Sequence, residues 1–208
     1  MDAASPRPEA DLPLDPVSTD RARLLSLIRE LAVVHGRVTL SSGAEADYYV
    51  DLRRITLHHE AAPMVGRVML ELLDGKGLAP EAVGGLTMGA DPVAGALLHA
   101  AAAQGRALDA FVVRKQGKAH GLQRQVEGPE VAGRAVVAVE DTMTTGGSVM
   151  TAVEALRAHG ADVLAVAVLV DRDTGARERI EAQGLDYLAV YTKGELGLDA
   201  DESTRPTD

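Results

Sequence analysis

Two adjacent carboxylates stand directly before a run of hydroxyl and glycine residues. Glu140 and Asp141 directly follow an apolar stretch. The residues that follow them are Thr142, Met143, Thr144, Thr145, Gly146, Gly147 and Ser148. Glycine and hydroxyl residues at the start of a helix bind an anion through free backbone N–H groups. Carboxylates beside a phosphate repel it unless something such as a sugar with vicinal hydroxyls lies between them, so the combination predicts a ribose 5-phosphate ligand.

Neither half of this pattern is specific by itself. Ser, Thr and Gly are common helix caps, and an acidic pair is often a solvated turn. The nucleoside-triphosphate loop GxxxxGK[ST] and the dinucleotide fingerprint GxGxxG are both absent from the chain. The apolar strand, the acidic pair and the glycine turn together form a much more specific pattern than any one of them.

Four basic residues gather in a second segment. Within seven residues of a chain with net charge −10 stand Arg114, Lys115, Lys118 and His120. A cluster of this kind is usually a solvated face. This one opens a polar connection of about 20 residues, and such length in a compact domain usually indicates a lid or a disordered insert. We expect a mobile cationic lid over an anionic ligand.

Apolar runs alternate with helical patterns over most of the chain. Strands are predicted at 82–86, 110–113, 135–139, 163–170 and 187–191, and helices at 60–74, 92–103, 147–159 and 174–183. Short apolar strands separated by helices indicate an α/β fold with a buried parallel sheet. Ligands of such sheets lie beyond the carboxyl ends of the strands. The junctions expected there are 87–91, 114–121, 140–148 and 171–174.

The N-terminal part has a different pattern. An amphipathic helix is predicted from a cap at residues 18–20, with Val34 as its last apolar residue and His35-Gly36 as its end. Residues 38–51 predict a hairpin whose turn lies at Ser42-Gly43.

Composition limits the function further. The 208 residues suit one domain at 18–193, between a proline-rich disordered lead-in at 1–17 and a polar acidic tail at 194–208. The absence of cysteine excludes thiolate catalysis and disulfides. The net charge of −10 argues against nucleic-acid binding, which needs a basic face. Neither a secretory signal nor a membrane-spanning apolar run is recognised, so a cytoplasmic protein is expected.

The segment VVAVEDTMTTGGS, residues 136–148, closely resembles the phosphoribosyl pyrophosphate (PRPP) signature of type I phosphoribosyltransferases. Three further segments are similar to the orotate-specific branch of this family: the SSG…DYYVD hairpin, the GADP junction and the RKxxKxHG loop. With four matches in the right order, residues 20–193 are identified as a member of this branch. The resemblance implies a type I phosphoribosyltransferase-like fold, with a central parallel sheet flanked by helices and a small N-terminal hood containing the hairpin.

The resemblance also implies an activity. The expected enzyme is a glycosyltransferase that moves the ribose 5-phosphate group of PRPP to orotate and gives orotidine 5′-monophosphate and pyrophosphate in pyrimidine (UMP) biosynthesis. Mg²⁺ is expected on the pyrophosphate, with no protein residue as its main ligand. Catalysis is assigned to Lys115, Lys118, His120 and Asp141. PRPP binding is assigned to Arg114, Lys115, Lys118, His120 and residues 140–148. A homodimer is implied, in which Lys115 acts across the interface.

The nucleobase is expected at a further set of residues. By resemblance, the orotate contacts are assigned to Thr144, Arg172, Tyr48 and Tyr49. Arg172 alone is more simply an exposed arginine beside Asp171 or Asp173, although a guanidinium at a strand end suits a planar carboxylate. If the tyrosines lie in a strand, only one of them can face the ligand, because neighbouring side chains point to opposite faces.

The chain departs from many relatives at two places, and two other functions share parts of its pattern. Ser41 stands where many relatives carry a lysine, and residues 87–90 lack another lysine, so PRPP affinity is expected to differ. A purine-salvage phosphoribosyltransferase would share the signature, but the tyrosine pair, the basic loop and Arg172 speak against it. A PRPP-sensing regulator that binds nucleic acid would need a basic face or an added DNA-binding module.

Overall fold

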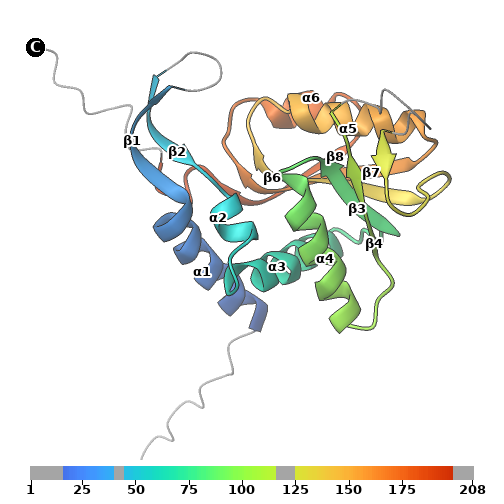
Figure 1. The fold of residues 1–208 in the computed structure, drawn as a ribbon, viewed down its shortest axis with the longest axis horizontal. Coiled ribbons are helices and arrows are strands. Elements are labelled where there is room, and N and C mark those ends of the chain that lie inside the picture. Colours follow the sequence, from blue (N-terminus) through green and yellow to red (C-terminus); the bar gives the residue numbers. More distant parts are fainter. Residues whose placement is uncertain (1–15, 40–44, 116–124, 199–208) are drawn as a thin grey trace, which may run out of the picture.

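The computed structural model describes residues 16–39, 45–115 and 125–198. Its centre is a six-stranded sheet with the order β5-β4-β3-β6-β7-β8, beside a separate two-stranded sheet (Figure 1). The central strands are β3 (Ala82–Leu86), β4 (Asp109–Val113), β5 (Val126–Glu127), β6 (Ala135–Met143), β7 (Asp162–Asp171) and β8 (Asp186–Thr192). Neighbouring strands pair in parallel except β4 and β5. The predicted parallel sheet is confirmed.

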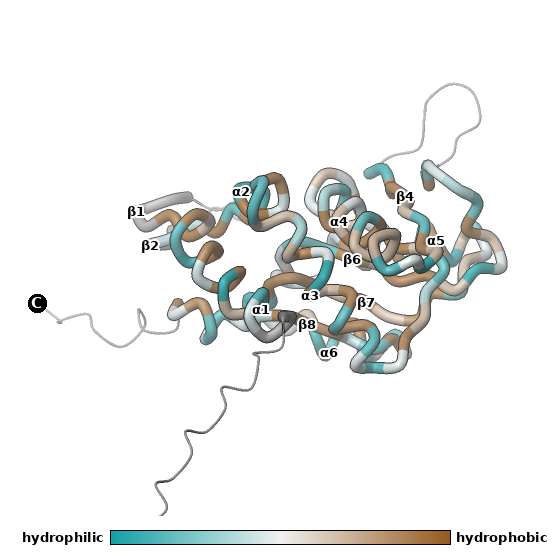
Figure 2. The backbone as a smooth tube through the Cα atoms, turned by 90° about the horizontal axis from the view of Figure 1, so that it is seen from below, coloured by the Kyte–Doolittle hydropathy of each residue, from teal (hydrophilic) through white to brown (hydrophobic). Residues whose placement is uncertain are grey.

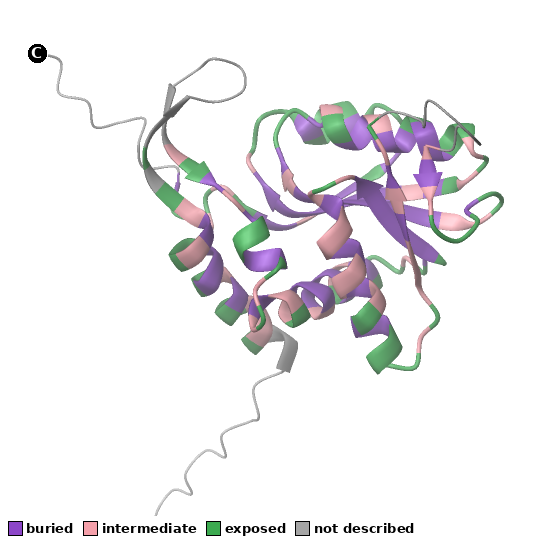
Figure 3. Cartoon of the chain, in the orientation of Figure 1, coloured by how far each residue is buried: buried purple, intermediate pink, exposed green. Residues whose placement is uncertain are grey.

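Helices cover both faces of this sheet. On one face lie α5 (Gly147–Ala158) and α6 (Ala176–Glu181), and on the other lie α3 (Ala61–Gly75) and α4 (Ala90–Ala103) (Figure 1). Side chains alternate along β6: Val137 and Val139 belong to the core that contains α3 and α4, whereas Val136 and Ala138 pack with α5 and α6. Burial on both faces (Figure 3) explains why the central strands are hydrophobic along most of their length (Figure 2).

The N-terminal residues form a small hood, residues 16–56. The helix α1 (Pro16–Leu27) continues into a π-helical turn η1 (Ile28–Ala32), and the antiparallel strands β1 (Val33–Thr39) and β2 (Glu45–Val50) follow. The short helix α2 (Arg53–Thr56) then leads towards α3. The predicted hairpin is confirmed, and the turn predicted at 42–43 lies outside the described residues.

The first helix ends earlier than the sequence pattern predicts. Val34 lies in β1, opposite Tyr49, and is 36% exposed. The β-branched pair Val33-Val34 favours a strand. Pairing with β2 outweighs the helical spacing, because only Val34 extends that spacing into this segment. The expectation that His35-Gly36 ends the helix is therefore wrong, because both residues lie within β1.

The end of β6 also differs from the sequence expectation. The strand runs four residues beyond the predicted end at Val139, and Glu140 and Thr142 pair in register with Val168 and Val170 of β7. The acidic pair therefore belongs to the rigid strand rather than to the turn after it. The short strand β5 and the helix α2 were not predicted, because each is only two to four residues long.

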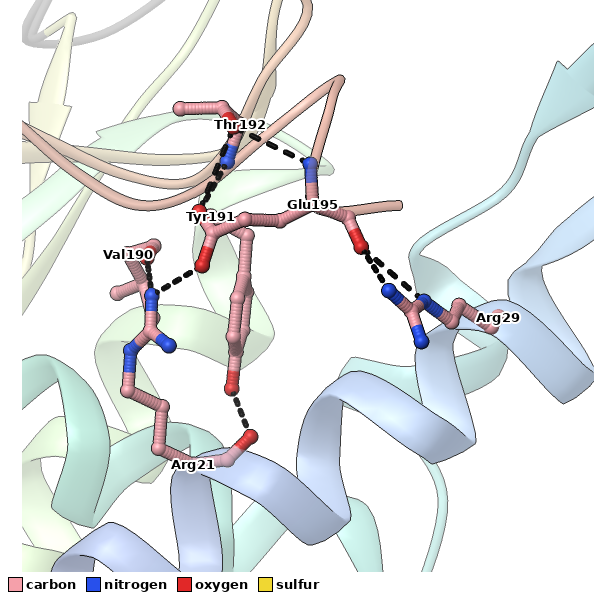
Figure 4. Close-up of polar contacts among 6 residues, drawn as sticks. All are labelled: Arg21, Arg29, Val190, Tyr191, Thr192 and Glu195. Carbon is pink, nitrogen blue, oxygen red and sulfur yellow. Dashed lines mark hydrogen bonds and ion pairs between the residues drawn. The ribbon is translucent and has the colours of Figure 1, made fainter. Parts of the chain in front are cut away.

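A polar network ties α1 to the end of the chain (Figure 4). The Arg21 guanidinium donates hydrogen bonds to the Val190 carbonyl at 2.8 Å and to Glu195 Oε1 at 2.6 Å. The hydroxyl of the fully buried Tyr191 donates to the Arg21 carbonyl at 2.7 Å, and the Tyr191 ring lies 4.8 Å from the guanidinium carbon. The network thus fixes α1 of the hood against β8.

The chain continues to pack on the core after β8. Leu196 and Leu198 are both buried, so the first part of the segment expected as a tail contributes to the domain as far as the structure describes it. Among the described residues, no helix has the length and apolar character needed to cross a membrane.

Candidate functional site

The carboxyl ends of β3 and β6 meet at the centre of the sheet. The chain proceeds from β3 to β4 on one side and from β6 through β7 to β8 on the other. The strand order reverses between β3 and β6, and ligands of open α/β sheets bind at such a point. A cavity of about 350 Å³ lies there. Its lining comprises residues 49–53, 86–89, Lys115, 140–142, Thr144 and Ser148.

The acidic pair forms one wall of this cavity. Glu140 is 7% exposed and Asp141 is 8% exposed. The Asp141 amide donates to Glu140 Oε1 at 3.2 Å, and the Thr142 amide donates to Asp141 Oδ1 at 2.7 Å. Burial, followed by the Asp141 charge, raises the pKa of Glu140 to about 8, and burial also raises the pKa of Asp141. Two such shifted carboxyls in one cleft are typical of a functional site.

The turn after β3 is shaped to fit the acidic pair. A Cβ atom at Gly89 would lie 2.5 Å from Glu140 Oε1 and 2.6 Å from Asp141 Oδ1, so a side chain at this position would displace the two carboxylates. The Thr87 hydroxyl donates to Asp91 Oδ2 at 2.7 Å and thereby joins the turn to the start of α4. The β3–α4 turn and the end of β6 therefore form one close-fitting unit.

The hydroxyl and glycine run leads from β6 into α5, as predicted. Gly146 precedes the helix with φ +77°, a backbone conformation that favours glycine. Thr144 and Ser148 line the cavity. The 12-residue helix α5 consequently begins at the cavity rim, where its first N–H groups and its dipole favour an anion.

Several residues of the signature do not line the cavity. These are Met143, Thr145, Gly146 and Gly147. Met143 is 2% exposed and packs in the core that contains α5 and α6, so its side chain points away from a ligand in the cavity. A contact from Met143 to PRPP would have to use its main chain.

The basic segment begins at the same place. Lys115 lines the cavity of its own chain, and together with Arg114, Thr87 and Met88 it lines an adjoining hollow of about 510 Å³. Arg114 Nη1 lies 3.4 Å from Glu127 Oε1, and Arg114 does not line the first cavity. Lys118 and His120 lie outside the described residues.

The residues expected to hold the nucleobase are brought together in part. The Arg172 guanidinium carbon lies 5.3 Å from the centre of the Tyr48 ring. Arg172 Nε is buried and has no hydrogen-bond partner among the described residues. Tyr49 is 39% exposed and lines the cavity, whereas Tyr48 and Arg172 do not. The two tyrosines therefore have different surroundings, as their neighbouring places in a strand require.

One part of the lining was not predicted from the sequence. Asp51 and Arg53 follow β2 and bring the end of the hood to the cavity. Both are ordinary charged residues next to a tyrosine pair, and a single sequence offers no spacing that distinguishes Arg53 from its neighbour Arg54. Only the placement of the hood beside β6 identifies Arg53 as a lining residue.

The comparisons with known proteins agree with this geometry. The phosphoribosyl transferase domain family matches residues 52–184. The orotate phosphoribosyltransferase of Streptomyces coelicolor is 68% identical over 180 residues, which cover 86% of this chain and 98% of that protein. The enzyme of Mycobacterium tuberculosis H37Rv is 59% identical over the same shares of both chains.

Solved structures give the same result. The crystal structure of the M. tuberculosis H37Rv orotate phosphoribosyltransferase with Fe(III) dicitrate has a TM-score of 0.78 at 59% identity, covering 86% of this chain and 99% of that one. Its complex with PRPP has a TM-score of 0.75 at 54% identity and the same coverage.

The parallel sheet, the buried acidic pair and the anion-binding turn after β6 are those of a protein with a type I phosphoribosyl transferase domain. At the level of sequence identity found along 86% of its length, the chain belongs to the orotate phosphoribosyltransferase family within that class.

Proposed function

We propose that the chain transfers the ribose 5-phosphate group of PRPP to orotate and releases orotidine 5′-monophosphate and pyrophosphate, as a step of UMP biosynthesis. The observation that carries the proposal is the cavity between β3 and β6, where a buried acidic pair faces the start of α5 in a chain of this family. The reaction breaks the bond between ribose C1 and a pyrophosphate oxygen and forms a bond from C1 to an orotate ring nitrogen. That nitrogen can react as an anion, so little base catalysis is needed.

The two ends of the cavity suit the two ends of ribose 5-phosphate. The N–H groups at the start of α5, with the hydroxyls of Thr144 and Ser148, suit the 5′-phosphate. Glu140 and Asp141 accept hydrogen bonds from the ribose hydroxyls in this arrangement. As pyrophosphate leaves, positive charge develops on the ribose, and the Asp141 carboxylate stabilises it.

Orotate is assigned to the space near Arg172, Tyr48, Tyr49 and Thr144. The buried Nε of Arg172 is a donor without a partner among the described residues, and a guanidinium pairs well with a carboxylate such as that of orotate. The Tyr48 ring beside it supports the orientation of the guanidinium.

Closure over the pyrophosphate is assigned to the basic segment. Arg114 and Lys115 lie at the hollows beside the β3–α4 turn, which supports a role for the segment at the leaving group. Lys118 and His120 complete the proposed set of cations, by resemblance. Cations that close over pyrophosphate stabilise its developing charge and exclude water.

Mg²⁺ is proposed as the metal. The oxygen donors of Glu140 and Asp141 fit a hard cation, and in the described part of the chain no group of three or more His, Cys, Asp or Glu is arranged to hold a metal ion. We therefore propose that Mg²⁺ enters with PRPP and is held mainly through the pyrophosphate, whose charge it neutralises.

A homodimer with shared sites is also proposed, because the resemblance implies that a cation of one subunit reaches the other subunit's site. The resemblance assigns this role to Lys115. The position of Lys115 at the cavity of its own chain is an observation against that assignment, and the two possibilities lead to opposite results in mixed dimers.

A substrate panel tests the proposed function. The purified protein with PRPP and Mg²⁺ is expected to consume orotate, measured by its ultraviolet absorbance, and to leave adenine, hypoxanthine and uracil unchanged. The same mixture without PRPP is the control. Consumption of a purine base in place of orotate would show that the orotate assignment is wrong.

A further inference from the structure

The cavity has an unfavourable charge for a substrate that carries both a phosphate and a pyrophosphate group. Its described lining contains three acidic residues, Asp51, Glu140 and Asp141. Its basic residues, in the same described lining, are Lys115 and Arg53. A polyanion binds such a surface only if each cation is well placed, because burying unpaired like charges together is costly. Arg53 is therefore more important for binding this substrate than its place in an ordinary charged stretch suggests.

Arg53 is held in a defined position. Its Nε donates to Asp51 Oδ1 at 2.8 Å, and its backbone N–H donates to the same oxygen at 3.2 Å. The hydrogen bond from Arg53 lowers the pKa of Asp51, which therefore stays ionised at neutral pH. Asp51 thus acts as a brace for the guanidinium.

The brace occupies only one side of the guanidinium. The hydrogen bonds of Arg53 to the described residues use Nε and the backbone N–H, which leaves both terminal NH₂ groups of the guanidinium for a ligand. A guanidinium with two such groups matches the paired oxygens of a phosphate. The Arg53 side chain is 46% exposed, so a ligand that enters the cavity can reach it.

Arg53 is also close enough to act on the acidic pair. Its positive charge lowers the pKa of Asp141 and opposes the larger effect of burial. Arg53 therefore acts within the same cavity as the carboxylate assigned to the ribose. The start of α5 already supplies donors for the 5′-phosphate, whereas Arg53 and Lys115 are the basic residues that the described lining offers to a second anionic group.

We propose that Arg53, braced by Asp51, is a further PRPP-binding residue that contacts the pyrophosphate group in the cavity shared with Glu140 and Asp141. The proposal rests on the proposed function, since it concerns the substrate of the same site. It also gives the hood a chemical role: the segment after β2 brings a cation to the leaving group. The hood then does more than cover the nucleobase.

Arg54 provides a matched control within the same helix. Arg54 has the same side chain and the same chain position within one residue, but its Nη1 donates to the Leu31 carbonyl at 3.3 Å and it does not line the cavity. A general loss of positive charge from α2 therefore affects both variants alike, and a contact with the substrate affects only Arg53.

Calorimetry with inorganic pyrophosphate and Mg²⁺ tests the proposal without requiring turnover. Arg53→Ala is expected to weaken pyrophosphate binding by about ten- to a hundredfold, the effect of one charge-assisted contact. Arg53→Lys should recover part of this loss, because a lysine keeps the charge but not the paired donors. Asp51→Asn should show a smaller loss, and Arg54→Ala should bind within about twofold of the wild type.

The other arms separate the possible causes. Ribose 5-phosphate should bind the wild type and Arg53→Ala equally, and the Michaelis constant for PRPP should rise while that for orotate changes little. Thermal melting checks that each variant is folded. Wild-type pyrophosphate affinity in a folded Arg53→Ala, or an equal loss in Arg54→Ala, would overturn the proposal, and a selective loss of ribose 5-phosphate binding would overturn the assignment to pyrophosphate. If Arg53→Ala selectively loses pyrophosphate binding but the wild type does not consume orotate, the proposed function fails and the assignment of Arg53 stands.

Discussion

At the scale of single residues, the acidic pair combines two opposing demands. The site needs carboxylates to accept the ribose hydroxyls, yet burial raises the pKa of both Glu140 and Asp141. Gly89 lies close against both carboxylates, and the backbone N–H groups of Asp141 and Thr142 donate to them. Buried charges of this kind are retained for binding or catalysis rather than for stability.

The charge of Asp141 should matter more for turnover than for substrate binding. Asp141→Asn keeps the shape of the side chain but removes the anion that favours the cationic ribose of the transition state. We expect kcat to fall by about ten- to a hundredfold, with a smaller change in the dissociation constant of PRPP. Single-turnover kinetics and equilibrium binding measure the two effects. An unchanged kcat with a raised Michaelis constant would show that the carboxylate only holds ground-state hydroxyls.

The raised pKa of Glu140 predicts how the stability of the free protein depends on pH. The unfolded chain ionises this carboxyl near its ordinary value of 4.5, whereas the folded protein ionises it near 8. Between these values the unfolded state has lost a proton that the folded state keeps, so the folded state loses stability as pH rises through this window. The loss should level off above the folded pKa.

Comparison with Glu140→Gln tests this effect. The variant has no titrating group at position 140, so the melting temperature of the wild type should fall relative to that of the variant between pH 5 and pH 9. Thermal melting across this range, without PRPP, measures the difference. A constant difference at all pH values would show that the folded pKa of Glu140 is not raised.

At the scale of elements, the sequence predicted those whose apolar pattern is long. The strands from β3 to β8 that exceed four residues and the helices α3 to α6 were all expected near their observed places, because burial on both faces imposes continuous apolar runs. Val34 was misassigned because a helical period and a β-branched pair overlap there, and pairing with Tyr49 in β2 decides the outcome. Local pattern cannot reveal a partner strand that lies fifteen residues away.

The candidate site was predictable to a similar extent. The acidic pair and the turn before α5 are contiguous in sequence, so their chemistry can be inferred from residue types alone. Arg53 became recognisable only in three dimensions, because its role depends on where the hood is placed beside β6. Arg172 and Tyr48 are 124 positions apart, and the sequence brought them together only through resemblance.

The contact between α1 and β8 should be important for holding the hood. Tyr191→Phe removes the hydroxyl that donates to the Arg21 carbonyl and leaves the ring in its buried site. We expect a loss of about 0.5–1.5 kcal/mol in the free energy of unfolding, the usual value of one hydrogen bond. Urea denaturation measures it. Wild-type stability in this variant would mean that the apolar contacts of α1 alone hold the hood in place.

At the scale of the whole molecule, the site draws on parts of the chain that are distant in sequence. The hood supplies Tyr49, Asp51 and Arg53, the sheet supplies the acidic pair, and the end of β4 supplies Lys115. The Arg21 network connects the hood to the last strand, so the position of the hood at the cavity depends on its contact with β8. A second subunit can complete such a site only with residues that the first subunit does not already place there.

This condition separates two assignments for the basic segment in the proposed homodimer. Lys115 lines the cavity of its own chain, so a chain with Lys115→Ala mixed with a chain carrying Asp141→Asn is expected to stay inactive. Each site of the mixed dimer then contains one of the two substitutions. If Lys115 acts across the interface instead, one site of the mixed dimer has both native residues and activity returns.

The matched arm replaces Lys115→Ala with Lys118→Ala and keeps Asp141→Asn in the other chain. If Lys118 is the cation that crosses between subunits, each mixed dimer has one site with both native residues. This mixture should then regain up to the activity of that one site. Two affinity tags purified in sequence isolate the mixed dimers and prove that subunits have exchanged. Recovery with Lys115→Ala would assign the crossing role to that residue, as the resemblance implies. If the mixed dimers are isolated and neither mixture recovers activity, each site depends on both lysines of its own chain. The proposal that one of these two lysines is shared between subunits is then wrong.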